Sequence, residues 1–187
     1  MSRTGSALTM ALVGMGLSLS LGLALQAAGA QAPALHTRSV LGGRVTLLIP
    51  RGFEPMSTEL LVRKYPSANR PNLVYSNSAT TINVALEHTA HHLPATQLAA
   101  AHQSIRSTFQ QMYPSAEWFR SEIRAINGRQ FFLLDLRTPA ADTAIRNILV
   151  GTSLDDRLLM ISFNVTRALE PEWLPSGNRI IESIAVK

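Results

Sequence analysis

Residues 117–137 read EWFRSEIRAINGRQFFLLDLR, and this stretch decides the fold. Two runs with strand-like composition, 117–126 and 129–137, flank the pair Asn127-Gly128. Asn-Gly is a preferred pair for a two-residue turn between antiparallel strands, because both central residues of that turn need a positive φ. The stretch therefore predicts a β-hairpin with its tip at Asn127-Gly128.

A second pair of strand-like runs follows along the chain. Residues 145–152 and 157–167 are rich in β-branched and aliphatic side chains, and Asp155-Asp156 lies between them. Within 157–167 apolar and polar side chains alternate, as they do in a strand with one buried face. One face holds Leu159, Ile161, Phe163 and Val165, and the other holds Met160, Ser162, Asn164 and Thr166. The two hairpins together predict a four-strand antiparallel meander.

The region before the first hairpin carries shorter strand signals. We expect strands at Val45–Ile49, Leu60–Tyr65, Asn72–Ser76 and Thr80–Glu87. The last of these runs alternates between an apolar face and a second face that includes Asn83. These runs extend the predicted sheet beyond the meander.

Two segments have the spacing of amphipathic helices. Between Pro94 and Met112 apolar side chains recur at intervals of three and four, and Pro94 suits a first helical turn. Residues 171–183 predict a shorter helix with Ile180 toward the core. The strands and helices do not alternate as βαβ units would. We therefore expect an α+β fold in which an antiparallel β-sheet is covered on one face by the two helices.

The first 30 residues have the layout of a secretory signal peptide. Arg3 is their only charged residue, and a Leu-rich run follows it. Ala28-Gly29-Ala30 and Ala30-Gln31-Ala32 both fit the small-residue cleavage rule, and the first avoids placing Pro33 beside the cut. The alternative is an uncleaved membrane anchor, since the run is long enough to span a bilayer. With cleavage after Ala30, no stable membrane span remains.

The rest of the chain reads as a short tether, 31–38, followed by one domain, 39–187, in which we find no internal repeat. The absence of Cys excludes disulfide scaffolds, thiol catalysis and a lipidated N-terminal Cys. The net charge of +5 arises from dispersed residues, with no basic run longer than Arg63-Lys64, so a nucleic-acid partner is not expected.

The order of the predicted strands and helices, together with several short motifs, resembles that of the PsbP/DcrB-like superfamily. The residues that carry the resemblance are 45–53 (VTLLIPRGF), 64–66 with 70–76 (KYP and RPNLVYS), the helix from Pro94, 126–129 (INGR), and 157–164 before the terminal helix. The superfamily includes DcrB-type bacterial envelope proteins and is related to Eag-type secretion chaperones. The resemblance implies a PsbP/DcrB-like αβ sandwich that acts as a binding or assembly module, with no shared catalytic triad.

A candidate partner surface lies on the first hairpin. If Ile123 and Phe132 face the helices, alternation places an Arg-rich and aromatic set on the open side of the sheet. That set is Trp118, Arg120, Arg124, Phe131 and Arg137. Aromatic and Arg side chains are enriched in protein interfaces. The alternative is an ordinary sheet face whose Arg stems cover apolar surface.

His88, His91 and His92 form the histidine cluster of the chain, where a strand ends and a helix is about to begin. Imidazoles at this spacing can bind zinc or copper. A metal site also needs a fixed geometry and supporting groups, and on a strand Glu87 would point away from His88. A solvated polar loop is therefore the favoured interpretation, with metal binding as the alternative.

These observations favour an exported, periplasmic protein without enzymatic activity. None of the motifs G-x-S-x-G, H-E-x-x-H, P-loop or G-x-G-x-x-G occurs, and no cofactor is expected. The leading hypothesis is a protein-binding module of the cell envelope, acting as an accessory, chaperone or immunity-type factor linked to a secretion system. The alternative is an envelope protein that binds a small ligand or a metal.

Overall fold

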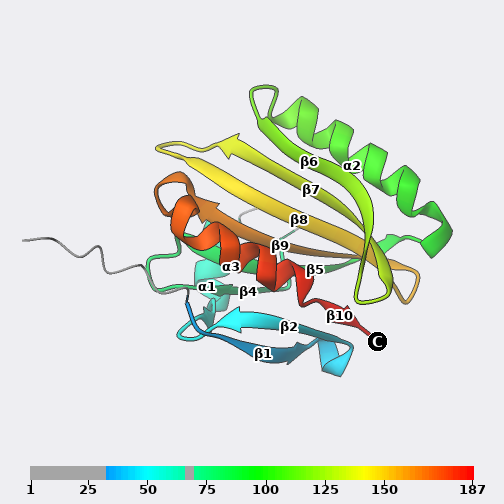
Figure 1. Ribbon diagram of the computed structural model, residues 1–187, viewed down its shortest axis with the longest axis horizontal. Helices are drawn as coiled ribbons and strands as arrows, with labels where there is room; N and C mark the ends of the chain where they lie inside the picture. Colours follow the sequence, from blue (N-terminus) through cyan, green and yellow to red (C-terminus); the bar gives the residue numbers. More distant parts are fainter. Residues whose placement is uncertain (1–32, 66–69) are drawn as a thin grey trace, which may run out of the picture.

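The central feature is a seven-stranded sheet with the order β3-β4-β5-β9-β8-β7-β6. The computed structural model describes residues 33–65 and 70–187, so the predicted signal peptide, 1–30, lies outside the described residues. All neighbouring strands of this sheet pair antiparallel. Its strands are β3 (Glu54–Pro55), β4 (Leu73–Ser76), β5 (Ile82–His92), β6 (Glu117–Ile126), β7 (Arg129–Pro139), β8 (Ala144–Leu154) and β9 (Arg157–Thr166). The predicted α+β class is confirmed (Figure 1).

Both hairpin turns of the meander lie at the residues that the sequence predicts. At the β6–β7 tip, Asn127 has φ 47° and Gly128 has φ 82°, the positive values that this turn requires. At the β8–β9 tip, Asp155 and Asp156 have φ 52° and 54°, which Asp tolerates better than most residues. Both hairpins are thus as predicted.

A smaller sheet has the order β1-β2-β10. Its strands are β1 (Leu35–Val40), β2 (Val45–Pro50) and β10 (Ala185–Val186), and the 3-10 turn η1 (Leu41–Gly43) joins the first two. Residues 35–38 of the predicted tether therefore belong to a paired strand, and the folded part begins before Ser39. The tether prediction failed because the segment lacks strand periodicity of its own and is ordered by its pairing with β2.

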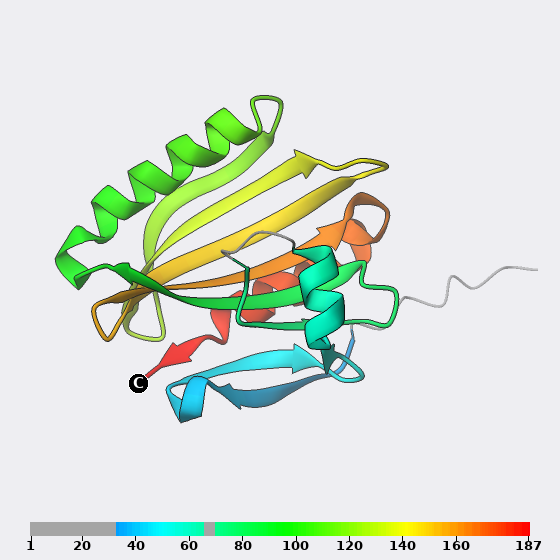
Figure 2. The ribbon, with the colours of Figure 1, turned by 180° about the vertical axis from the view of Figure 1, so that it is seen from behind.

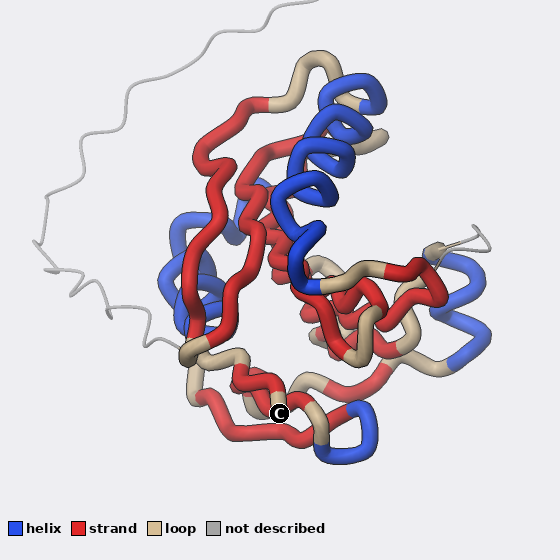
Figure 3. Tube along the Cα trace, turned by 90° about the vertical axis from the view of Figure 1, so that its right-hand side faces the viewer, coloured by secondary structure: helices blue, strands red, loops and turns tan. Residues whose placement is uncertain are grey.

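The two long helices cover opposite faces of the large sheet. α2 (Leu98–Met112), preceded by the 3-10 turn η2 (Ala95–Gln97), packs on one face, near β6 and β7. α3 (Glu170–Glu182), preceded by η3 (Arg167–Leu169), packs on the other face with the small sheet. Figure 2 shows α2 running along the β6 edge of the sheet, and Figure 3 shows the two helices on opposite sides of the sheet.

The expectation that both helices share one face is therefore wrong. The physical reason lies in β7, where every side chain from Phe131 to Leu136 is buried. Phe131 and Leu133 belong to the core under α3, whereas Phe132 and Leu134 belong to the core under α2. A strand that is apolar on both faces needs a cover on each.

The predicted strand Leu60–Tyr65 is instead the helix α1 (Thr58–Lys64). Ser57 caps it, with its hydroxyl accepting a hydrogen bond from the Leu60 amide at 3.2 Å. Glu59 in the first turn and Arg63 and Lys64 in the last turn match the helix dipole. These cap and charge signals outweigh the strand-like composition of the run. No described helix is both long and apolar enough to cross a membrane.

Candidate functional site

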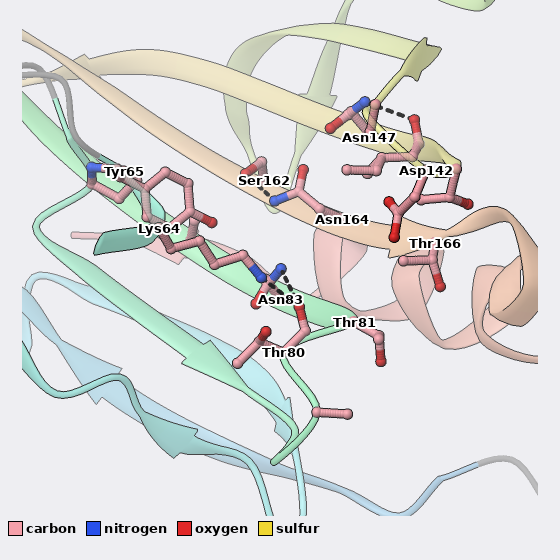
Figure 4. Close-up of a pocket in the computed structure, with 16 residues that line it drawn as sticks. Lys64, Tyr65, Thr80, Thr81, Asn83, Asp142, Asn147, Ser162, Asn164 and Thr166 are labelled. Atoms are coloured by element: carbon pink, nitrogen blue, oxygen red, sulfur yellow. Dashed lines mark hydrogen bonds between the residues drawn. The ribbon is translucent and has the colours of Figure 1, made fainter. Parts of the chain in front are cut away.

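Three asparagines form a row on the face of the large sheet that carries α2, across the part of that face that α2 does not cover. Asn83 on β5 is the register partner of Asn164 on β9, which in turn is the partner of Asn147 on β8. Directly paired residues of neighbouring strands point to the same face, so the three carboxamides lie side by side. Figure 4 shows Asn164 between the other two.

The row is the floor of a groove of about 560 Å³, which we name the polar compartment. Lys64 and Tyr65, at the end of α1, line one side of it. Asp142 and Thr143, in the turn between β7 and β8, line the other. Figure 4 shows the Lys64 side chain reaching along the floor toward Thr80, whose backbone carbonyl accepts a hydrogen bond from its ammonium group.

The groove continues into a smaller apolar compartment of about 190 Å³. Its walls include Phe109 of α2, Leu149 of β8 and Met160 of β9, and Glu87 of β5 lies at its edge. The two compartments share Pro71, Ala85 and Ser162. We call the two compartments together the groove. A ligand bound there would meet a polar floor and an apolar end at once.

Three ionisable groups of the groove have shifted pKa values. Burial lowers the pKa of Lys64 and raises the pKa of Tyr65 in the polar compartment. Burial also raises the pKa of Glu87 beside the apolar compartment. In each case partial removal from water disfavours the charged form. Such perturbed groups are concentrated at functional sites, which supports the groove as the candidate site.

The groove offers hydrogen bonding and charge. The Ser162 hydroxyl accepts a hydrogen bond from the Asn164 amide at 3.1 Å. Among the described residues that line the groove none is His or Cys. The lining groups therefore suit recognition of a bound molecule.

The five residues predicted as one partner surface do not share an open face. A bulge in β6 at Phe119 shifts the register, so that Trp118 pairs with Leu136 and Arg120 pairs with Asp135. Trp118 consequently packs under α2, with the Arg106 guanidinium 6.0 Å from its ring centroid. Phe131 is only 1 % exposed. The prediction failed for Trp118 because the bulge reverses its facing, and for Phe131 because α3 covers that face of β7.

The three predicted arginines are held in ion pairs beside α3. Arg120 bonds Asp135 and Asn178, each at 2.9 Å, and Arg124 bonds Glu182. Arg137 bonds Glu170 at 3.0 Å and also Glu117. These contacts tie α3 to β6 and β7. The guanidinium groups of the three arginines are therefore occupied by ion pairs within the chain.

A buried ion-pair network lies at the centre of this region. The Arg146 guanidinium bonds both Asp135 and Glu170, and all three residues are buried. The Phe119 ring covers the Arg146 guanidinium at 3.2 Å from its centroid. The network satisfies charges that would otherwise be costly to bury.

The histidine cluster does not converge. The Nε2 atom of His88 lies 3.0 Å from the Leu154 carbonyl oxygen, and His91 and His92 are exposed near the end of β5. Within the described ranges there is no group of three or more His, Cys, Asp or Glu placed to hold a metal ion. The three imidazoles are not brought together as a ligand set.

Sequence reasoning missed the groove, although part of its signal was visible. Asn83 and Asn164 both lie on the non-apolar faces of strands that alternation identified. What the sequence could not supply was the pairing of β5 with β9, which brings together positions 81 residues apart. The position of α1 beside the groove is not predicted either, because the composition of residues 60–65 favours a strand.

Several solved structures have the same architecture. Their sequence identity to this chain is low, but the matches cover most of both chains. Cyanobacterial PsbP (CyanoP) from Synechocystis sp. PCC 6803 matches with 14 % identity and a TM-score of 0.59, over 85 % of this chain and 96 % of that one. The Ran-binding protein Mog1p of Saccharomyces cerevisiae matches with 14 % identity and a TM-score of 0.54, over 83 % and 96 %. LpqN of Mycobacterium tuberculosis, involved in cell envelope biogenesis, matches with 10 % identity and a TM-score of 0.52, over 76 % and 83 %.

At these identities the likeness is one of fold. The chain has a PsbP-like fold, as the resemblance of its motifs implied. No protein-family model and no curated protein sequence matches it.

Proposed function

We propose that this protein with a PsbP-like fold is an exported, non-enzymatic protein-binding module that receives a segment of a partner protein in its groove. The observation that carries the proposal is the in-register row of Asn83, Asn164 and Asn147 next to an apolar compartment. Carboxamides both donate and accept hydrogen bonds, so they can pair with peptide groups. An adjacent apolar compartment can hold an anchoring side chain.

Export and a binding role have independent support. The first 30 residues have the pattern of a secretory signal, with cleavage after Ala30. Among the proteins of like fold, Mog1p is a Ran-binding protein and LpqN is involved in cell envelope biogenesis. A periplasmic accessory, chaperone or immunity-type factor is consistent with both properties.

The absence of catalysis is part of the proposal. Ser162 lines both compartments of the groove, and its hydroxyl is hydrogen-bonded to the Asn164 amide, which cannot act as a general base, and to neither groove carboxylate. A hydroxyl that is not hydrogen-bonded to a base is a weak nucleophile at neutral pH. The groove is therefore proposed to bind its partner without altering it chemically.

The test is capture of envelope proteins on immobilised protein beginning at Gln31. Ser162→Arg places a long charged side chain in the groove, and Ser115→Arg makes the same change at an exposed position elsewhere. We expect wild type and Ser115→Arg to retain the same partner and Ser162→Arg to lose it, with equal melting temperatures. Retention of the same partner by Ser162→Arg would refute the groove as its site.

A small ligand is the second candidate for the groove. The polar compartment, about 560 Å³, lies within the range of roughly 300–1,000 Å³ common for small-molecule sites. Native mass spectrometry of protein purified from its own envelope separates the two candidates. A bound small molecule that is absent from Ser162→Arg would favour this function over protein binding.

A further inference from the structure

The floor of the groove carries amide oxygens that accept no hydrogen bond from any described residue. Both N–H groups of the Asn147 amide donate within the chain, to Thr138 Oγ1 at 3.0 Å and to the Ile145 carbonyl at 2.9 Å. A carbonyl can only accept, so this amide cannot be turned around without losing a bond. The Oδ1 atom of Asn147 therefore remains as an acceptor on the groove floor.

Asn83 offers a second amide oxygen at a more buried position. The residue is 6 % exposed, and its Nδ2 atom donates to the Thr80 carbonyl at 3.5 Å. Its Oδ1 atom is buried and accepts no hydrogen bond from any described residue. Buried acceptors are nearly always paired, so this oxygen marks a place where a donor is missing.

The charged side chains of the groove favour a positively charged hydrogen-bond donor. Its charged side chains among the described residues are Lys64, Asp142 and Glu87. The Lys64 ammonium is already bonded to the Thr80 carbonyl, whereas neither carboxylate has an ion-pair partner in the described part of the chain. The groove thus has a surplus of acid in a chain whose net charge is +5.

We propose that the groove recognises an arginine side chain in the partner segment, with a neighbouring large apolar side chain in the apolar compartment. This inference rests on the proposed protein-binding function. A guanidinium group has five N–H donors in one plane and no acceptor, which complements a floor of amide oxygens flanked by carboxylates. A lysine ammonium carries the same charge but only three donors, and it is more strongly hydrated.

The experiment uses four short peptides as probes on protein beginning at Gln31. They are acetyl-Leu-Arg-Leu-amide and its counterparts with Lys, Gln or Glu at the centre. Binding is followed by the side-chain amide NMR signals of Asn83, Asn147 and Asn164 and by calorimetry. We expect the Arg peptide to shift these signals and to bind about tenfold more tightly than the Gln peptide, the effect of one charge-assisted interaction.

Variants test the role of charge. Asp142→Asn combined with Glu87→Gln should weaken binding of the Arg peptide by about fivefold or more and leave the Gln peptide unaffected. Asp156→Asn, an exposed acid at the tip of the β8–β9 hairpin, is the matched control and should change neither.

The outcomes separate this inference from the function on which it rests. Equal binding of the Arg and Gln peptides, preference for the Glu peptide, or an absence of shifts at the three asparagines would overturn the arginine proposal. If the envelope partner is still lost from Ser162→Arg, protein binding in the groove stands without it. If Ser162→Arg keeps that partner, both proposals fail.

Discussion

At the scale of single residues, Asp135 is the acid on which the buried ion-pair network depends most. It is 1 % exposed and accepts hydrogen bonds from both Arg120 and Arg146. Asp135→Asn keeps the shape but leaves the buried Arg146 charge with less compensation. We expect a loss of about 3–5 kcal/mol in the free energy of unfolding, measured by urea denaturation. Asp156→Asn, which is exposed, should change stability by no more than about 0.5 kcal/mol, and similar losses in both variants would contradict this account.

We expect His102 to make the free energy of unfolding depend on pH. It is buried in α2, stacks on Phe132, and its Nε2 atom lies 2.9 Å from Ser121 Oγ. Burial, and to a smaller degree the positive charge of Arg106, lowers the pKa of His102 from its ordinary value of 6.5. The unfolded chain therefore takes up a proton near pH 6.5 that the folded chain resists, so stability is retained above this pH and is lost as the pH falls below it.

The test of this prediction compares wild type with His102→Gln. Unfolding free energies measured from pH 8 to pH 5 should fall more steeply in wild type below about pH 6.5. Parallel curves for the two proteins would show that His102 does not contribute to the pH dependence.

At the scale of elements, α3 approaches β9 closely because Gly177 has no side chain. A Cβ atom at this position would lie 2.4 Å from two carbon atoms of the Phe163 ring, which is itself fully buried. Helix propensity alone predicts that Gly→Ala inside a helix stabilises by about 1 kcal/mol. The steric conflict predicts the opposite sign for Gly177→Ala, a loss of about 1–3 kcal/mol. Thermal and urea unfolding decide between them, and a stabilised variant would contradict the close packing of α3.

Elements whose signals are local could be predicted from the sequence. The β6–β7 hairpin follows from Asn127-Gly128, and α2 follows from the spacing of its apolar side chains. Features that have no signal in their own residues could not be predicted. The bulge at Phe119 and the strand β1 are decided by contacts with other strands, and they changed the facing of Trp118 and the start of the fold.

The candidate site was harder to predict than the fold for the same reason. Its floor joins three strands, and its flanks come from α1 and the turn between β7 and β8. The polar faces of β5 and β9 were apparent, but nothing local showed that Asn83 and Asn164 are neighbours. The Arg-rich set looked like an exposed surface because the ion pairs that engage it come from distant residues, such as Glu170 and Glu182.

At the scale of the whole molecule, the exported form should begin at Gln31. We expect cleavage after Ala30 to remove the Leu-rich segment. None of the described helices is both long and apolar enough to span a membrane. Intact-mass measurement of protein from the periplasmic fraction checks this expectation. A full-length chain recovered from the membrane fraction would instead support the anchored alternative.

The central claim is that the groove is where a partner protein binds. Its most direct test is site-specific photo-crosslinking in living cells, with a photoreactive residue at Thr81 or Thr143 in the groove and at Gln110 or Glu172 on the outer surfaces of α2 and α3. The account predicts one crosslinked partner from both groove positions and none from the two control positions. Crosslinks to that partner from Gln110 or Glu172, with none from Thr81 and Thr143, would contradict it.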